Sequence, residues 1–137
     1  VLWLNPDNRE LIDELSGMNF FAVINGKLVT PALNGCMLEG VTRDSVIKLA
    51  QSTNIDVIES ELSIDEVLSA ISDGSCTEAF ACGTAAIVSP ISCLHDKGTD
   101  YIPKHPEGKI ANQMRDKLLG LQEGRIDDEF GWIKPVR

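Results

Sequence analysis

Three short segments carry groups that could do chemistry together. Segment 14–19 places the carboxylate of Glu14 beside a tight turn, at the end of an expected strand. Segment 40–44 enters an expected helix after a glycine, so its first N–H groups could hold an anion. Segment 78–90 places Gly83 and Thr84 between two apolar runs, where successive N–H groups could cradle an anion. Two donor-rich turns and one carboxylate would suit a phosphorylated cofactor with a basic ring nitrogen.

Each segment also has an ordinary structural interpretation, which spacing alone leaves open. Glu14 fits an exposed side chain on an edge strand. Thr42 fits a helix N-cap with nothing bound to the helix. Gly83 fits a tight hairpin corner in a core, because turn chemistry alone accounts for a glycine there. The fold must decide whether the three segments meet in space.

Composition narrows the class of protein. The chain has 137 residues, which is enough for one domain with a hydrophobic core. Its net charge of −9 is unfavourable for binding nucleic acid. The four cysteines form no CxxC pair and the two histidines lack ligand spacing, so we expect no metal site. Neither a membrane-spanning apolar run nor a secretory pattern is present, and we expect a cytoplasmic protein.

Hydrophobic spacing and turn residues indicate the elements that must position these segments. We expect strands over 1–4, 9–15, 19–24, 27–30 and 55–59, a strand–turn–strand over 78–90 that continues through 91–94, and a terminal edge strand over 131–136. We expect helices that begin near Thr42 as N-cap, at the Ser63–Glu66 capping box, and over 110–124. Asn25 and Gly26 predict a hairpin turn. The order is not a regular strand–helix alternation, so it favours a mixed α+β domain.

The first strand is unusual, because residues 1–4 form a bare apolar run with no polar lead-in. A strand that is apolar on both faces belongs in the middle of a sheet. A chain that begins on such a strand looks like part of something longer, and we expect its exposed edge to pair with another chain.

Four segments, in order, resemble branched-chain amino acid aminotransferases of the pyridoxal-phosphate fold type IV class. They are residues 14–23 (ELSGMNFFAV), 28–45 (from LVTPALNG to LEGVTRDS), 83–86 (GTAA) and 124–132 (GRIDDEFGW). The resemblance runs from Val1 to the end of the chain. It implies an α+β fold: the mixed sheet or pseudo-barrel of the D-amino acid aminotransferase-like large domain, with about three helices.

The resemblance also implies roles for particular residues. Glu14 would hold the protonated pyridine nitrogen of pyridoxal 5′-phosphate and keep its ring an electron sink. Val41 and Thr42 would give backbone N–H groups, and Thr42 its hydroxyl, to the cofactor phosphate. Thr84 would add a further phosphate hydrogen bond, and the backbone of Thr84 and Ala85 would face the substrate carboxylate.

One expected residue has no counterpart. In this family a lysine binds the cofactor covalently and moves the substrate's α-proton, and it lies upstream of the glutamate segment. None of the lysines here matches it: Lys27, Lys48, Lys97, Lys104, Lys109, Lys117 and Lys134. We therefore expect residues 1–137 to be a C-terminal cofactor-binding domain, truncated before Val1, without the N-terminal domain and inactive alone.

The parent enzyme implied by the resemblance would move an amino group between leucine, isoleucine or valine and 2-oxoglutarate. It would be a dimer, or this chain would need a companion chain. Two alternatives stay open: another fold type IV enzyme, such as a D-amino acid aminotransferase or aminodeoxychorismate lyase, and a non-catalytic orphan domain.

Overall fold

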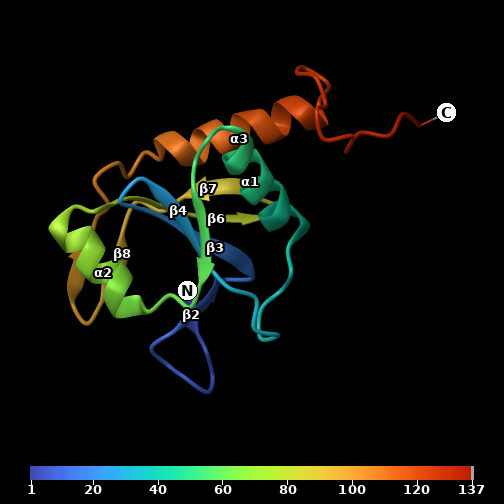
Figure 1. The fold of residues 1–137 in the computed structure, drawn as a ribbon. Coiled ribbons are helices and arrows are strands. Elements are labelled where there is room, and N and C mark those ends of the chain that lie inside the picture. Colours follow the sequence, from blue (N-terminus) through green and yellow to red (C-terminus); the bar gives the residue numbers. More distant parts are fainter. Residues whose placement is uncertain (137) are drawn as a thin grey trace.

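The computed structural model describes residues 1–136 and has an α+β fold, as expected (Figure 1). The strands are β1 (Leu2–Leu4), β2 (Ile12–Leu15), β3 (Met18–Ile24), β4 (Lys27–Pro31), β5 (Val57–Ser60), β6 (Cys76–Gly83), β7 (Ile87–Pro90), β8 (Leu94–Asp96) and β9 (Thr99–Tyr101). The helices are α1 (Val41–Ser52), α2 (Ile64–Asp73) and α3 (Lys109–Gln122).

Strand β3 organises the main sheet. Strand β6 pairs with it along one edge, while β2 pairs with the first residues of the other edge and β4 with the last residues of that edge. Strand β5 runs parallel to β4, and the chain after β5 returns to β2, where Ile12 N–H donates to Leu62 O at 2.8 Å. An isolated bridge between Leu11 and Ser63 completes this ring, which gives β2 to β5 the character of a small barrel.

Two apolar clusters hold the layers together. One lies between the sheet and the helices α1 and α3, which pack side by side over β6 and β7 (Figure 1). At its centre Phe21 and Phe80 stack with ring centroids 5.1 Å apart. The other cluster packs α2 against the opposite side, through Val67, Leu68 and neighbouring strand residues. The sheet is thereby covered on both sides.

Several local predictions are confirmed. Asn25 and Gly26 adopt φ values of 50° and 74° between β3 and β4, as a two-residue hairpin turn requires. Ser63 Oγ accepts the Glu66 N–H at 3.1 Å, and Glu66 Oε2 accepts the Ser63 N–H at 2.9 Å, which completes the capping box of α2. The strand–turn–strand over 78–90 forms as β6 and β7.

Three predictions near the ends of elements are wrong. Thr42 is not the N-cap of α1, because Gly40 occupies that position and α1 begins at Val41. Strand β1 does not lie in the middle of the sheet: within residues 1–136 it pairs with β2 alone, and Trp3 is 55% exposed. The strand expected to continue through residues 91–94 ends at Pro90 instead. Of these four residues, Ile91 alone donates a backbone hydrogen bond to β6, and Leu94 pairs with Tyr101 in a separate hairpin.

The predicted terminal strand over 131–136 is also wrong, since this part of the chain has no regular structure. The carboxylate of Asp128 accepts the N–H groups of Phe130 at 3.2 Å and Ile133 at 2.6 Å, which folds the chain back on itself. The Trp132 ring stacks on Phe130 with centroids 4.3 Å apart, and both rings pack against the α1–α3 core. Local hydrogen bonds and ring packing replace a strand ladder here.

Candidate functional site

A row of paired residues crosses the sheet and brings two of the candidate segments together. Glu14 of β2 pairs with Asn19 of β3, and Asn19 pairs on its other side with Cys82 of β6. Directly opposed residues of antiparallel strands project from the same face, with Cβ atoms about 4.5–5.5 Å apart. Glu14 is therefore one strand from Asn19, and Thr84 follows two residues after Cys82.

The third segment joins the other two through Asn19. The side-chain amide of Asn19 donates from Nδ2 to Leu38 O at 3.0 Å. Its Oδ1 lies against Gly40, where a Cβ atom would overlap it. The start of α1 is thus held beside the row that contains Glu14 and Cys82. All three candidate segments meet around one buried asparagine.

Within residues 1–136, the N–H groups of Val41 and Thr42 at the start of α1 have no hydrogen-bond acceptor. Gly40 has no side chain to cap the helix, and the first N–H with an intrahelical acceptor is that of Asp44, which donates to Gly40 O at 3.1 Å. The N–H groups of Val41 and Thr42 therefore point out of the helix end, where the helix dipole favours an anion. Val41 is exposed and Thr42 is half-buried, so an anion can reach them.

The turn between β6 and β7 is exposed at Thr84 and Ala85. Ile87 closes it with φ +59°, which is uncommon for a β-branched residue and costs about 1–3 kcal/mol. Strain of this kind persists only where the surrounding structure imposes it. No local sequence pattern indicates this conformation, which sets the direction in which Thr84 and Ala85 leave the sheet.

The carboxylate of Glu14 is available for a ligand. Glu14 is half-buried, between Asn19 on one side and Trp3 on the other. Within residues 1–136, no side chain or backbone N–H donates a hydrogen bond to it. The sheet register fixes the backbone of Glu14, and its carboxylate has room to accept a hydrogen bond from a ligand.

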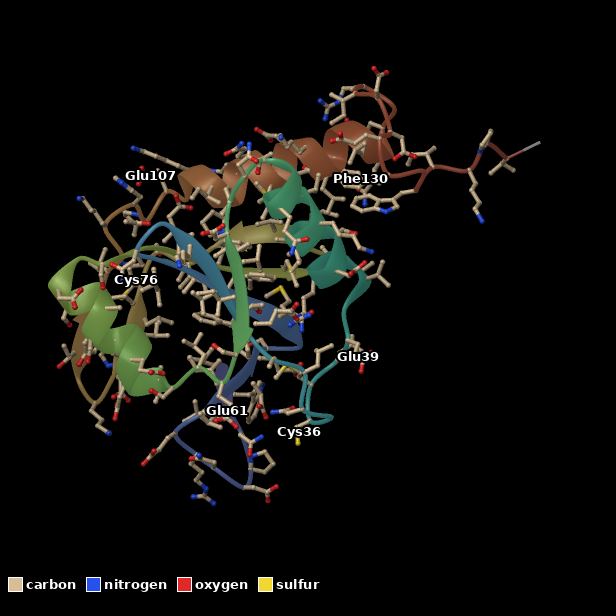
Figure 2. The ribbon with its side chains drawn as sticks, viewed as in Figure 1. Cys36, Glu39, Glu61, Cys76, Glu107 and Phe130 are labelled. Carbon is tan, nitrogen blue, oxygen red and sulfur yellow. The ribbon has the colours of Figure 1, made fainter. Side chains whose placement is uncertain are left out.

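Two buried polar groups behind the site were not singled out from the sequence. Arg43 is 4% exposed and donates from a terminal guanidinium nitrogen to Pro31 O at 3.0 Å and to Glu59 Oε2 at 2.6 Å. Asp13 is 4% exposed and accepts from Asn34 Nδ2 at 2.8 Å. These contacts fix the loop 32–40, marked in Figure 2 by Cys36 and Glu39, against the strands. Because these hydrogen-bond partners are far apart in the sequence, no local sequence pattern indicates the contacts.

The buried thiols do not contribute reactive groups. Burial raises the pKa of Cys82 to about 12 and that of Cys76 to about 11, so both remain neutral near pH 7. Across residues 1–136, no cluster of His, Cys, Asp and Glu could hold a metal ion. Over the same residues no helix is both long and apolar enough to cross a membrane.

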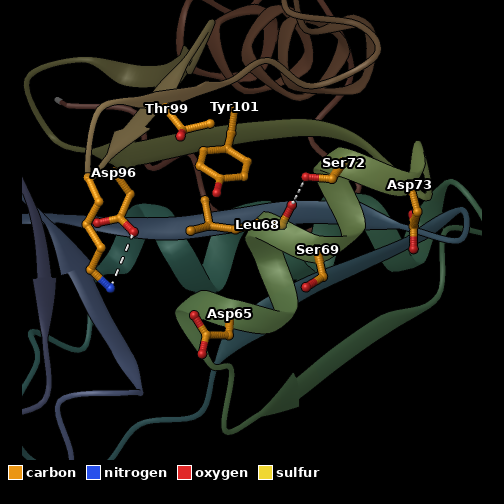
Figure 3. Close-up of a pocket in the computed structure, with 9 residues that line it drawn as sticks. Asp65, Leu68, Ser69, Ser72, Asp73, Asp96, Thr99 and Tyr101 are labelled. Atoms are coloured by element: carbon orange, nitrogen blue, oxygen red, sulfur yellow. Dashed lines mark hydrogen bonds and ion pairs between the residues drawn. The ribbon is translucent and has the colours of Figure 1, made fainter.

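A broad hollow lies away from the three segments. It has a volume of about 780 Å³ and is open to solvent, between α2 and the β8–β9 hairpin (Figure 3). Its lining residues are Asp65, Leu68, Ser69, Ser72, Asp73, Asp96, Lys97, Thr99 and Tyr101. Two smaller cavities, of about 270 and 400 Å³, share Val41 at the start of α1. Neither Glu14 nor Thr84 lines any of these three hollows.

Comparisons with known proteins find a family model and several named relatives. The family model "Amino-transferase class IV" matches residues 1–94. Branched-chain-amino-acid aminotransferase 2 of Bacillus subtilis is 44% identical over 137 residues, which is 99% of this chain and 38% of that protein. The branched-chain-amino-acid aminotransferase of Mycolicibacterium smegmatis is 39% identical over 138 residues, 97% of this chain and 38% of that protein.

Solved structures are similar as well. The branched-chain amino acid aminotransferase of Escherichia coli superposes with a TM-score of 0.78 at 30% identity, over 97% of this chain and 41% of that chain. A mutant of the enzyme of the same name from Thermobaculum terrenum superposes with a TM-score of 0.81 at 33% identity, over 98% and 41%. The chain thus spans about 38% of the length of the Bacillus and Mycolicibacterium relatives.

Proposed function

The chain belongs to the class IV aminotransferase family, and on that premise we propose that it is the C-terminal, cofactor-binding part of a longer branched-chain amino acid aminotransferase. The relatives that carry this name match nearly all of the chain, while the chain matches about 38% of each. The observation that supports the proposal is that Asn19 connects Glu14 of β2, Cys82 of β6 and the loop that leads into α1.

The residues present fit pyridoxal 5′-phosphate. The free N–H groups of Val41 and Thr42 and the hydroxyls of Thr42 and Thr84 are the donors that a phosphate needs. The carboxylate of Glu14 suits a basic ring nitrogen, since an opposite charge favours the protonated form of that nitrogen. When bound, the cofactor supplies an electron sink that makes the α-proton of an amino acid removable.

The chain's own groups then have distinct tasks. Glu14 holds a proton at the ring nitrogen, and the first turn of α1 anchors the phosphate by its dipole and N–H groups. The backbone of Thr84 and Ala85 faces the carboxylate of the substrate and orients its α-carbon. Binding and orientation of this kind lower the barrier by holding the reacting atoms in place before reaction.

The proton-moving lysine comes, in this proposal, from the part of the enzyme outside this chain. Of the lysines here, Lys48 lies on the solvent side of α1 and pairs with Asp44 at 2.7 Å. In this proposal the chain contributes groups that bind and position the cofactor, and it does not transaminate alone. Leucine, isoleucine or valine and 2-oxoglutarate are the proposed substrates, and a homodimer the proposed assembly.

A substrate panel tests the proposal. The parent protein, supplied with pyridoxal phosphate and 2-oxoglutarate, is expected to form glutamate with L-leucine and not with D-alanine. Preference for D-alanine would assign the chain to another fold type IV enzyme. Absence of transamination with either amino acid would overturn the transaminase proposal and favour the lyase or the non-catalytic domain. The isolated 137-residue chain is expected to be inactive in the same assay.

A further inference from the structure

Asn19 is a buried polar residue that links the strand of Glu14, strand β6 and the loop before α1. It is 6% exposed and lies on β3, between Glu14 of β2 and Cys82 of β6. Its amide donates to Leu38 O at 3.0 Å, in the loop that leads into α1. A buried amide of this kind is held in one orientation by its bond and its packing.

The contact between Asn19 and Gly40 explains why the N-cap residue of α1 is a glycine. Gly40 has φ −68° and ψ 130°, which is extended backbone that any residue adopts. Its conformation therefore does not require glycine. The requirement is space, because a Cβ atom at Gly40 would overlap Asn19 Oδ1, while its other neighbours would stay at 3.4 Å or more. The helix end is thus seated directly on the Asn19 amide.

The contact between Asn19 and Gly40 fixes the distance between Glu14 and the start of α1. Glu14 is one strand from Asn19, a spacing of about 4.8 Å. The N–H groups of Val41 and Thr42 follow directly after Gly40, which the Asn19 side chain contacts. A rigid ligand held by a carboxylate at one end and by a helix start at the other needs this separation to be constant.

We propose that Asn19 is a positioning residue that sets the first turn of α1 relative to Glu14, so that a phosphorylated pyridine ligand meets both at once. The inference rests on the proposed function, because it needs pyridoxal phosphate as the ligand. It adds a residue whose side chain acts on the helix start and the sheet, without itself being assigned a bond to the cofactor.

The test is a double-mutant cycle in the parent protein, with dissociation constants measured for pyridoxal phosphate and for pyridoxal, which lacks the phosphate. Asn19→Ala is expected to weaken pyridoxal phosphate binding about 10-fold, the equivalent of one lost hydrogen bond. Binding of pyridoxal should change by less than about 2-fold, because only the phosphate end has moved.

The cycle partner is Gly40→Ala, which places a methyl group against Asn19 Oδ1. In the wild-type background it is expected to weaken pyridoxal phosphate binding about 10-fold. In the Asn19→Ala background the methyl group has room, and the same change should cost less than about 2-fold. A coupling of this size would show that the two substitutions weaken binding through the contact between Asn19 and Gly40, and not independently of each other.

The matched control is Asn112→Ala. Its amide makes the same kind of bond, to Glu107 O at 2.9 Å, but at the start of α3. Asn112→Ala should leave the ratio of the two dissociation constants unchanged. The inference is overturned if Asn19→Ala weakens both ligands equally, or if the two substitutions add without coupling.

Two further outcomes are decisive. Failure of the wild-type parent to bind pyridoxal phosphate overturns the proposed function, and with it this inference. If Asn19→Ala does not fold, Gly40→Ala alone gives the answer, because an unchanged ratio of dissociation constants there shows that α1 does not depend on the Asn19 seat.

Discussion

The carboxylate of Glu78 on β6 accepts the backbone N–H of Ile110 on α3 at 2.9 Å. It also accepts the N–H of Ala111 at 3.1 Å. Glu78 is 2% exposed, and Gly108, the N-cap residue of α3, has no side chain that could do the same. A buried strand residue thus caps a helix far along the chain, and its charge suits the helix start.

Glu78→Ala is expected to destabilise the protein by about 1–3 kcal/mol, because it leaves buried N–H groups without an acceptor. Urea denaturation of the parent protein measures this. Glu107→Ala, an exposed glutamate before the same helix, is the control and should cost less than about 0.5 kcal/mol. Equal effects of the two substitutions would show that Glu78 does not cap α3.

Arg43→Ala should destabilise the protein by about 1–3 kcal/mol, because it leaves Pro31 O without its donor, while the remaining Glu59 carboxylate is partly exposed to water. The loss arises from the buried bonds to Pro31 O and Glu59, which tie α1 to the ends of β4 and β5. Lys48→Ala on the same helix removes an exposed pair with Asp44 and should cost at most about 0.5 kcal/mol. Melting temperatures of the two variants would contradict this account if they were equal.

Alkaline pH should destabilise the fold through its buried thiols. The unfolded thiol of Cys82 ionises near 9.0, whereas burial raises its folded pKa to about 12. A raised folded pKa gives stability that is complete below pH 9.0 and is lost as the pH rises toward 12, by about 1.4 kcal/mol per pH unit.

The measurement is unfolding free energy between pH 9 and pH 11 for wild type, Cys82→Ala and Cys36→Ala. Cys82→Ala is expected to flatten the dependence, leaving the contribution of Cys76. Cys36 is exposed, so its substitution should leave the slope as in the wild type. A slope unaffected by Cys82→Ala would contradict the assignment.

Local chemistry in the sequence predicted local structure correctly. Asn25–Gly26 predicted its hairpin and Ser63 with Glu66 predicted its helix start, because each pattern satisfies backbone groups within a few residues. The same reasoning placed the N-cap of α1 at Thr42, whereas Gly40 takes that position against Asn19. A contact between residues far apart in the sequence decided that helix start.

The same difference between local interactions and contacts of distant residues applies to the candidate site. Glu14, Val41, Thr42, Thr84 and Ala85 were named from the sequence, and the fold brings their segments together; their roles toward a cofactor stay predictions. Asn19, Glu78 and Arg43 were not singled out, because their partners lie across strands or on distant helices. The 131–136 segment misled for a related reason, since Asp128 and the Phe130–Trp132 stack override its apolar pattern.

The central proposal is that Glu14 holds the ring nitrogen of the cofactor in a transaminase. One measurement tests this proposal most directly: kcat of the parent protein with L-leucine and 2-oxoglutarate. Glu14→Gln keeps the shape and removes the charge at the ring nitrogen, and is expected to lower kcat by about 10²-fold or more. Glu10→Gln, an exposed glutamate before β2, should leave kcat within about 2-fold. A wild-type rate in Glu14→Gln would contradict the account.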